Sequence, residues 1–176
     1  MPSAETQFVH IVIVGTSLLS NAGWTSGKLL PAKKTLVDKL RSGDPRQLSA
    51  ELNGLMPFIE SGQCHRAHLV ATNTPQGKLA RDVLASHLQS RGVQITGVSA
   101  GDLLPESFEK AAGQAAFEGG IRKFRETVFR AARKAQLGGA QVRLNATGGL
   151  KAEVAVAVLI AAELGVPAYY LHQSMA

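Results

Sequence analysis

The feature that most restricts the fold of this chain is the largely apolar, β-branched run Phe8–Val14, which ends at Gly15. A continuous run of this kind is typical of a strand that is buried on both faces of a parallel sheet. Further strand patterns follow, at residues 67–72, 93–98, 141–146 and 168–172. Helical patterns separate them, which predicts βαβ units with right-handed crossovers. We therefore expect one α/β domain over residues 1–176, a Rossmann-like three-layer sandwich with a mainly parallel sheet.

The helical patterns place apolar residues on one face at spacings of three and four. They run over residues 48–59, 79–88 and 121–135. Gly119 and Gly120 precede the third pattern and are expected to break a longer helix. The segment 150–164 is apolar on nearly every side, which predicts a central and buried helix. The helical segments between Pro31 and Gly62 exceed what a simple crossover requires, and we expect either an insertion or a dimer surface there.

Charge and cysteine content restrict the partners of the chain. Nineteen Lys and Arg residues against thirteen Asp and Glu residues give a net charge of +6, which favours an anionic partner. A single cysteine, Cys64, excludes an internal disulfide framework and a multi-thiolate metal site. The longest apolar run, residues 154–162, is too short to cross a bilayer, and the amino terminus lacks the pattern of a signal peptide. We therefore expect a cytoplasmic protein without membrane contact.

Two glycine-containing turns follow strand patterns at opposite ends of the chain, at residues 15–21 and 145–151. Each is typical of an ordinary strand-to-helix turn, in which glycine permits positive φ and Ser or Thr caps the helix. Lys151 is unusual, because it lies in the first helical turn, where the helix dipole disfavours a cation. Backbone N–H groups at a glycine-rich helix start, together with a lysine, form an anion site. Because ligands of such sheets bind where the strand order reverses, we expect the two loops to meet around a phosphate.

Together and in this order, the two motifs resemble those of the CRISPR-associated Rossmann fold (CARF) family, and within it the stand-alone ring nucleases and the related sensor domains of type III CRISPR systems. The first-strand motif of the family is similar to Gly15-Thr16-Ser17-Leu18-Leu19, with Asn21 behind it. Its carboxyl-terminal motif is similar to Asn145-Ala146-Thr147-Gly148-Gly149-Leu150-Lys151-Ala152-Glu153. The resemblance spans essentially the whole chain, although the middle third matches only in architecture.

The resemblance implies a homodimer whose shared cleft binds a cyclic oligoadenylate, with cyclic tetra-adenylate preferred and no long nucleic acid. A ring nuclease of this family cleaves the messenger and thereby switches off type III CRISPR signalling. By motif position, the resemblance implies catalytic roles for Ser17 and Lys151. It implies ligand contacts at Gly15, Thr16, Leu18, Asn21, Asn145, Thr147, Gly148 and Gly149. It implies neither a metal nor another cofactor.

Asn73 follows the second strand pattern on the same edge of the predicted sheet. Its side chain either forms an Asx-type turn that starts the next helix or contacts an adenine or ribose of the ligand. Both interpretations remain open at this point.

The chemistry that the resemblance implies needs few groups. RNA supplies its own nucleophile, the ribose 2′-oxygen, so a site must hold that oxygen in line with phosphorus and stabilise the charged transition state. Lys151 would neutralise the developing charge, while Ser17 and loop N–H groups would orient the phosphoryl oxygens. The product would be linear, with a 2′,3′-cyclic phosphate. No histidine lies in either motif, so an evident general base is missing and we expect a slow enzyme.

Two other function classes compete with this one. A binding module that senses or sequesters the same messenger and regulates a partner would need the same phosphate-binding residues, so the sequence leaves it open. A dinucleotide-dependent oxidoreductase would need Gly-x-Gly-x-x-Gly after the first strand and an acidic residue after the second. The loop Gly15-Thr16-Ser17 lacks that pattern, and Thr72-Asn73 contains no acid, so we reject this class.

Three further patterns indicate no separate function. Residues 81–87 have the loose Arg/His spacing of a HEPN ribonuclease motif, but that motif belongs to an all-helical domain. Residues 64–68 hold half of a zinc ligand set without a second cluster. Residues 23–28 are one residue short of a phosphate loop between the glycines, and the required Ser or Thr is absent. Within the last pattern, Trp24 and Lys28 are expected either to lie over a bound ring or to serve as ordinary packing and surface residues.

Overall fold

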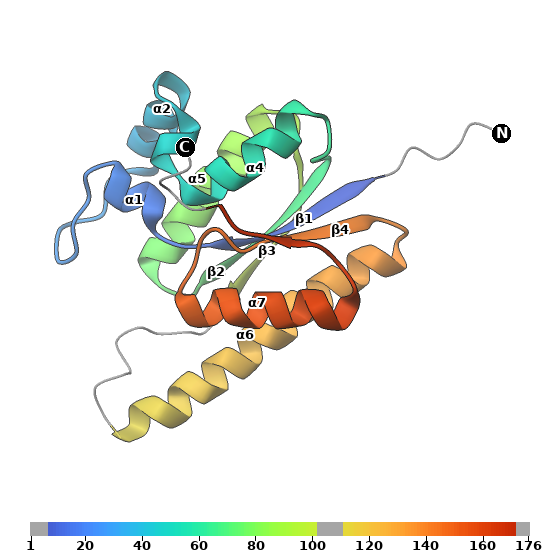
Figure 1. Ribbon diagram of the computed structural model, residues 1–176. Helices are drawn as coiled ribbons and strands as arrows, with labels where there is room; N and C mark the ends of the chain where they lie inside the picture. Colours follow the sequence, from blue (N-terminus) through green and yellow to red (C-terminus); the bar gives the residue numbers. More distant parts are fainter. Residues whose placement is uncertain (1–6, 102–110, 172–176) are drawn as a thin grey trace.

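A computed structural model of the protein describes residues 7–101 and 111–171, and these form a single sheet with helices on both faces (Figure 1). The sheet has five strands in the order β3-β2-β1-β4-β5, and every described pairing is parallel. The strands are β1 (Phe8–Val14), β2 (Arg66–Thr72), β3 (Gln94–Gly101), β4 (Gln141–Asn145) and β5 (Ala168–Tyr169). The predicted α/β class and the parallel sheet are therefore confirmed. The predicted last strand extended to His172, which lies outside the described residues.

The helices form one layer on each face of the sheet (Figure 1). They are α1 (Ser17–Asn21), α2 (Lys33–Ser42), α3 (Pro45–Leu48), α4 (Ala50–Glu60), α5 (Pro75–Ser90), α6 (Ala111–Leu137) and α7 (Lys151–Leu164). Helices α1, α2, α4 and α5 contribute to the core on one face, and α6 and α7 pack on the other. This arrangement is the predicted three-layer sandwich. None of the helices in the described parts of the chain is both long and apolar enough to cross a bilayer.

Strand β1 is the centre of the core because it lies between β2 and β4. Val12 and Val14 enter the core on one face, while Ile11 and Ile13 enter it on the other, and all four are almost fully buried. Burial on both faces explains why the sequence of β1 shows no alternation. The chain crosses from the β2 side of β1 to the β4 side, so the strand order reverses between β1 and β4. The carboxyl ends of these two strands are neighbours, with Val12 paired to Asn145.

Helix α6 is continuous through Gly119 and Gly120, so the predicted break there is wrong. Glycine in a helix interior costs about 1 kcal/mol relative to alanine, so two consecutive glycines favour the prediction of a helix break. Here the helix packs Phe124, Val128 and Ala132 fully into the core on the sheet. Burying a side chain such as phenylalanine stabilises the fold by about 1.5–3 kcal/mol, so the packing outweighs the glycines.

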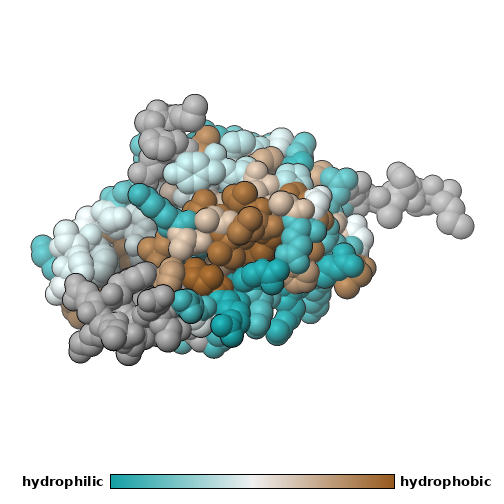
Figure 2. Space-filling view, turned by 60° about the horizontal axis from the view of Figure 1, so that its bottom comes forward, coloured by the Kyte–Doolittle hydropathy of each residue, from teal (hydrophilic) through white to brown (hydrophobic). Residues whose placement is uncertain are grey.

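The prediction of a central, buried helix at residues 150–164 is also wrong. Helix α7 lies in an outer layer and buries only Glu153, Ala157, Ile160 and Ala161. On its other side Val158 is 49% exposed and Leu159 is 68% exposed. Figure 2 shows hydrophobic residues gathered on this face of the molecule, where α7 comes forward. A contiguous apolar surface of this kind is typical of an interaction site.

The segment between Pro31 and Gly62 belongs to the core layer over the sheet. Leu36 and Leu40 of α2 are buried there, together with Leu52 and Leu55 of α4. These helices therefore shield one face of the sheet, including β1, from solvent. Their buried side chains place this segment among the elements on which the fold depends.

Candidate functional site

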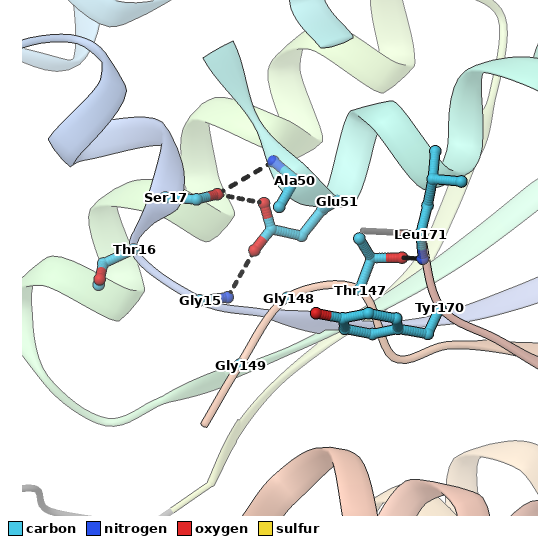
Figure 3. A pocket seen from close by; sticks show the side chains of 10 residues that line it. All are labelled: Gly15, Thr16, Ser17, Ala50, Glu51, Thr147, Gly148, Gly149, Tyr170 and Leu171. Carbon is cyan, nitrogen blue, oxygen red and sulfur yellow. Dashed lines mark hydrogen bonds between the residues drawn. The ribbon is translucent and has the colours of Figure 1, made fainter. Parts of the chain in front are cut away.

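The two glycine loops meet in a pocket at the carboxyl end of the sheet, as the strand order predicts (Figure 3). The pocket has a volume of about 270 Å³. It is lined by Gly15, Thr16, Ser17, Ala50, Glu51, Thr147, Gly148, Gly149, Tyr170 and Leu171. These residues come from the turn between β1 and α1 with the first residue of α1, the start of α4, the loop after β4 and the segment after β5. Four segments that are distant in sequence thus converge on one polar cavity.

The glycines of both loops are needed for close approach. A Cβ on Gly15 would lie 2.7 Å from the backbone nitrogen of Gly149, so the two loops touch through their main chains. A Cβ on Gly148 would overlap the carboxylate of Glu51 and come within 2.6 Å of the carbonyl oxygen of Ile13. Gly149 also has φ of +91°, a conformation that side chains disfavour. The glycine pattern therefore reflects the packing of the loops against each other and against Glu51.

Glu51 is the residue of this site that the sequence motifs miss. Glu51 is 1% exposed as a residue, and its carboxylate accepts three hydrogen bonds. The donors are the Gly15 N–H at 2.7 Å, the Ser17 hydroxyl at 3.0 Å and the Ser49 hydroxyl at 2.6 Å. Glu51 also lies in the first turn of α4, where the helix dipole favours a negative charge. These contacts compensate for burying a carboxylate.

Ser17 lines the pocket, but its hydroxyl is already engaged on two sides (Figure 3). Ser17 Oγ donates to Glu51 Oε2 at 3.0 Å and accepts from the backbone N–H of Ala50 at 3.1 Å. Thr16 precedes it, is exposed and also lines the pocket. The structure therefore brings both residues to the predicted place and ties Ser17 to an acid that the motif does not contain.

Asn145 and Thr147 have different positions. Asn145 is fully buried; its side-chain N–H donates to the carbonyl of Glu51 at 3.0 Å, and its oxygen accepts from the N–H of Thr147 at 3.0 Å. It thus joins β4 to α4 beneath the pocket and does not line it. Thr147 does line the pocket, and its hydroxyl accepts from the N–H of Leu171 at 3.3 Å.

Lys151 is the first residue of α7 and is exposed. It does not line the pocket, and it makes no hydrogen bond or ion pair with another residue of the described ranges. The same helix start holds a buried acid, Glu153, whose carboxylate accepts from the N–H of Leu150 at 2.6 Å. Burial raises the pKa of Glu153, and this hydrogen bond opposes the rise. Lys151 is two residues beyond Gly149, which lines the pocket.

Like Asn145, three further predicted contact residues do not line the pocket. The side chain of Leu18 is buried in the core, so only its backbone is available to a ligand. The amide of Asn21 donates to the carbonyl of Gln47 at 3.0 Å, which joins α1 to α3. Asn73 is exposed in the turn before α5, where Thr74 caps the helix by accepting from Gly77. None of the three lines the cavity.

A groove continues from this pocket toward the end of β2. Its volume is about 390 Å³, and it shares Gly15, Thr16 and Gly149 with the pocket. Its remaining lining residues are Val14, Trp24, Ser26, Thr72, Thr74, Gln76, Leu150 and Glu153. Trp24 lines this groove, and its indole N–H donates to the carbonyl of Lys28 at 3.0 Å. The pocket and the groove together form an elongated site, which suits a ligand larger than a single phosphate.

The residues of the rejected patterns have ordinary structural roles. Arg81 pairs with its neighbour Asp82, and His87 is buried on α5. Burial raises the pKa of the Cys64 thiol to about 12, so it remains protonated. Within the described ranges, His, Cys, Asp and Glu side chains form no group of three or more that could hold a metal ion.

The sheet order and the pocket define a Rossmann-like α/β protein with its site where the strand order reverses. A family model described as CRISPR-associated protein (Cas_APE2256) matches residues 46–176. The match covers most of the chain, and the protein belongs to this family of CRISPR-associated proteins. The matched region includes Glu51 and the second glycine loop, whereas the first loop precedes it. No curated protein matches the chain.

Proposed function

We propose that this CRISPR-associated protein is a cytoplasmic ring nuclease of the CARF type. It binds a cyclic oligoadenylate, with cyclic tetra-adenylate preferred, and cleaves it without a metal ion to end type III CRISPR signalling. The observation that carries the proposal is the contact between the two motif loops, with Gly15 directly against Gly149 in one polar pocket. Membership in a CRISPR-associated family supports the biological setting. The net charge of +6 suits a ligand that carries several phosphates.

The proposed ligand-binding unit is a homodimer that forms across the exposed apolar face of α7. Val158 and Leu159 are exposed on this helix, and Leu150 is exposed directly before it; an apolar surface of this kind favours burial against another chain. Because α7 begins directly after the second glycine loop, a twofold contact across it keeps both pockets near the interface. A ring of identical nucleotides presents equivalent groups to the two copies, so one set of loops used twice holds opposite sides of the ring.

In the proposed reaction the ribose 2′-oxygen attacks the adjacent phosphorus, and a linear product with a 2′,3′-cyclic phosphate leaves. Lys151 approaches the scissile phosphate from the start of α7 and neutralises the charge that develops on its oxygens. The backbone of Gly148 and Gly149 lies at the wall of the pocket beside this helix start. Positioning and charge stabilisation are sufficient for a slow transesterification.

A sensor that binds the ring without cleaving it is the second candidate. The observation that favours it is Glu51, which occupies the Gly15 N–H and the Ser17 hydroxyl and leaves fewer donors for a phosphate. A module of this kind would regulate a partner protein or sequester the messenger.

The test compares the intact protein with Lys151→Ala and Lys33→Ala in the presence of a chelator. Lys33 is a matched control, because it is also an exposed lysine at the first position of a helix, α2. We expect intact protein and Lys33→Ala to cleave cyclic tetra-adenylate equally, and Lys151→Ala to be slower by about 10²–10³-fold. Tight binding without cleavage would favour the sensor, and absence of binding would refute both candidates.

A further inference from the structure

The hydroxyl of Ser17 has a defined hydrogen-bond direction. A serine hydroxyl has one proton to donate and two lone pairs that accept. The proton of Ser17 is directed at the Glu51 carboxylate, and the Ala50 N–H occupies one lone pair. One lone pair therefore remains for a ligand in the pocket that Ser17 lines. Ser17 presents itself to a ligand as an acceptor.

Because the Ser17 hydroxyl can only accept a further hydrogen bond, it can contact only a ligand group that donates one. The oxygens of a phosphodiester are acceptors only, so a hydroxyl whose proton is held by Glu51 cannot orient them. A ribose 2′-hydroxyl is a donor and fits the remaining lone pair. The Ser17 interaction that the sequence motif implies, with phosphoryl oxygens, therefore conflicts with the contacts of this site.

We propose that Ser17 and Glu51 form a proton relay that accepts the proton of the attacking 2′-hydroxyl. The inference rests on the proposed ring-nuclease function and supplies the general base that neither sequence motif contains. Ser17 touches the substrate and is catalytic, whereas Glu51 acts through Ser17 and is a positioning residue. The Gly15 N–H and the Ser49 hydroxyl hold the Glu51 carboxylate in place for this role.

The step balances without a further reactant besides water. The 2′-O–H bond breaks as its proton passes to Ser17 Oγ, while the original Ser17 proton passes to Glu51 Oε2. The 2′-oxygen bonds to phosphorus and the bond from phosphorus to the 5′-oxygen breaks. The leaving 5′-oxygen takes a proton from water, and Glu51 later returns its proton to solvent through Ser17. General-base assistance of this kind contributes about 10²–10⁴-fold to a rate.

The first experiment measures single-turnover cleavage of cyclic tetra-adenylate by full-length Glu51→Gln, Ser17→Ala and the double variant. Each single substitution is expected to slow cleavage at saturating ring by about 10²-fold or more, while ring affinity falls by no more than about three- to tenfold. The double variant is expected to be no slower than the slower single variant, because the two residues act as one unit. Glu60→Gln makes the same substitution at the exposed end of α4 and is expected to cleave at the normal rate. Thermal melts show whether each variant folds.

The second experiment measures binding and needs no cleavage. The intact protein and Ser17→Ala are compared for affinity toward cyclic tetra-adenylate and its fully 2′-deoxy analogue, before turnover. The relay predicts that the intact protein prefers the ribose ring about three- to tenfold through this hydrogen bond, and that Ser17→Ala loses the preference. A serine that orients phosphate would instead weaken both rings equally on substitution.

The outcomes separate the relay from the proposed function. If the intact protein neither binds nor cleaves the ring, both fail. If it cleaves while Glu51→Gln and Ser17→Ala retain its rate, or if Ser17→Ala weakens both rings alike, the relay is wrong and the ring nuclease stands. If Glu51→Gln does not fold, the Ser17→Ala comparison between the two rings decides the matter alone. Loss of rate together with loss of the ribose preference supports the relay.

Discussion

Gly148→Ala and Gly119→Ala make the same chemical change, yet the structure predicts opposite effects on stability. At Gly148 the added methyl group overlaps the Glu51 carboxylate and lies within 2.6 Å of the Ile13 carbonyl oxygen. Three donors hold the carboxylate, and the carbonyl belongs to the central strand, so neither moves cheaply. Forcing a methyl group into a packed site costs about 1–3 kcal/mol. At Gly119 a methyl group meets nothing within 4 Å, and alanine in a helix gains about 1 kcal/mol.

Thermal denaturation of the two variants measures both effects. For a chain of this length, 1 kcal/mol corresponds to a shift in Tm of about 2–4 °C. We expect Gly148→Ala to lower Tm by about 2–12 °C and Gly119→Ala to raise it by about 2–4 °C. A Gly148→Ala protein as stable as the original would show that Glu51 does not lie against the second loop. A Gly119→Ala protein with a lower Tm would refute the continuous helix α6.

Three further predictions concern other parts of the molecule. Leu159→Glu places a charge on the exposed face of α7 and should convert the proposed dimer to a monomer in analytical ultracentrifugation. The Tm extrapolated to low protein concentration should not change. A dimer that persists would argue against this face as the dimer interface. Burial lowers the pKa of His10 to about 4 from an unfolded value of 6.5, so the unfolded chain binds the proton first and stability should fall between pH 6.5 and 4. In urea titrations the free energy of unfolding should fall by about 3 kcal/mol over this pH range in the intact protein and by less in His10→Gln. Equal pH dependence in the intact protein and in His10→Gln would contradict this assignment. Cys64 is buried with its pKa raised to about 12, so iodoacetamide should modify it only in urea, and rapid modification of the native protein would show that the thiol is accessible.

Much of the fold follows from sequence because the central strand has an unambiguous pattern. The run Phe8–Val14 lacks alternation since both of its faces are buried, and the other strands follow at βα spacing. The meeting of the two glycine loops also follows, because a reversal of strand order next to β1 places the carboxyl ends of β1 and β4 side by side. The pocket was thus predictable from topology.

Glu51 was not predictable from the same reasoning. It is a single acid within a stretch whose neighbours, from Ser49 to Met56, are all buried. Its burial depends on donors from the first glycine loop, which lies more than thirty residues earlier in the chain. The available signal was a serine helix cap followed by an acid in the first turn, and that pattern indicates a helix start without indicating a pocket.

Helix α7 exposes another limit of sequence patterns. A helix that is apolar on every side carries no information about which side faces the core, so a buried position was the simplest expectation. The structure places one side on the sheet and leaves Val158 and Leu159 exposed. The same composition therefore serves a core contact and an outer surface that we assign to a second copy.

The measurement to make first is the mass of the products formed when the purified protein is incubated with cyclic tetra-adenylate and cyclic hexa-adenylate in a chelator. The proposed mechanism predicts linear fragments that end in a 2′,3′-cyclic phosphate, formed faster from the tetra-adenylate ring. Recovery of both rings intact after prolonged incubation would contradict cleavage at the pocket of Gly15, Glu51 and Gly149.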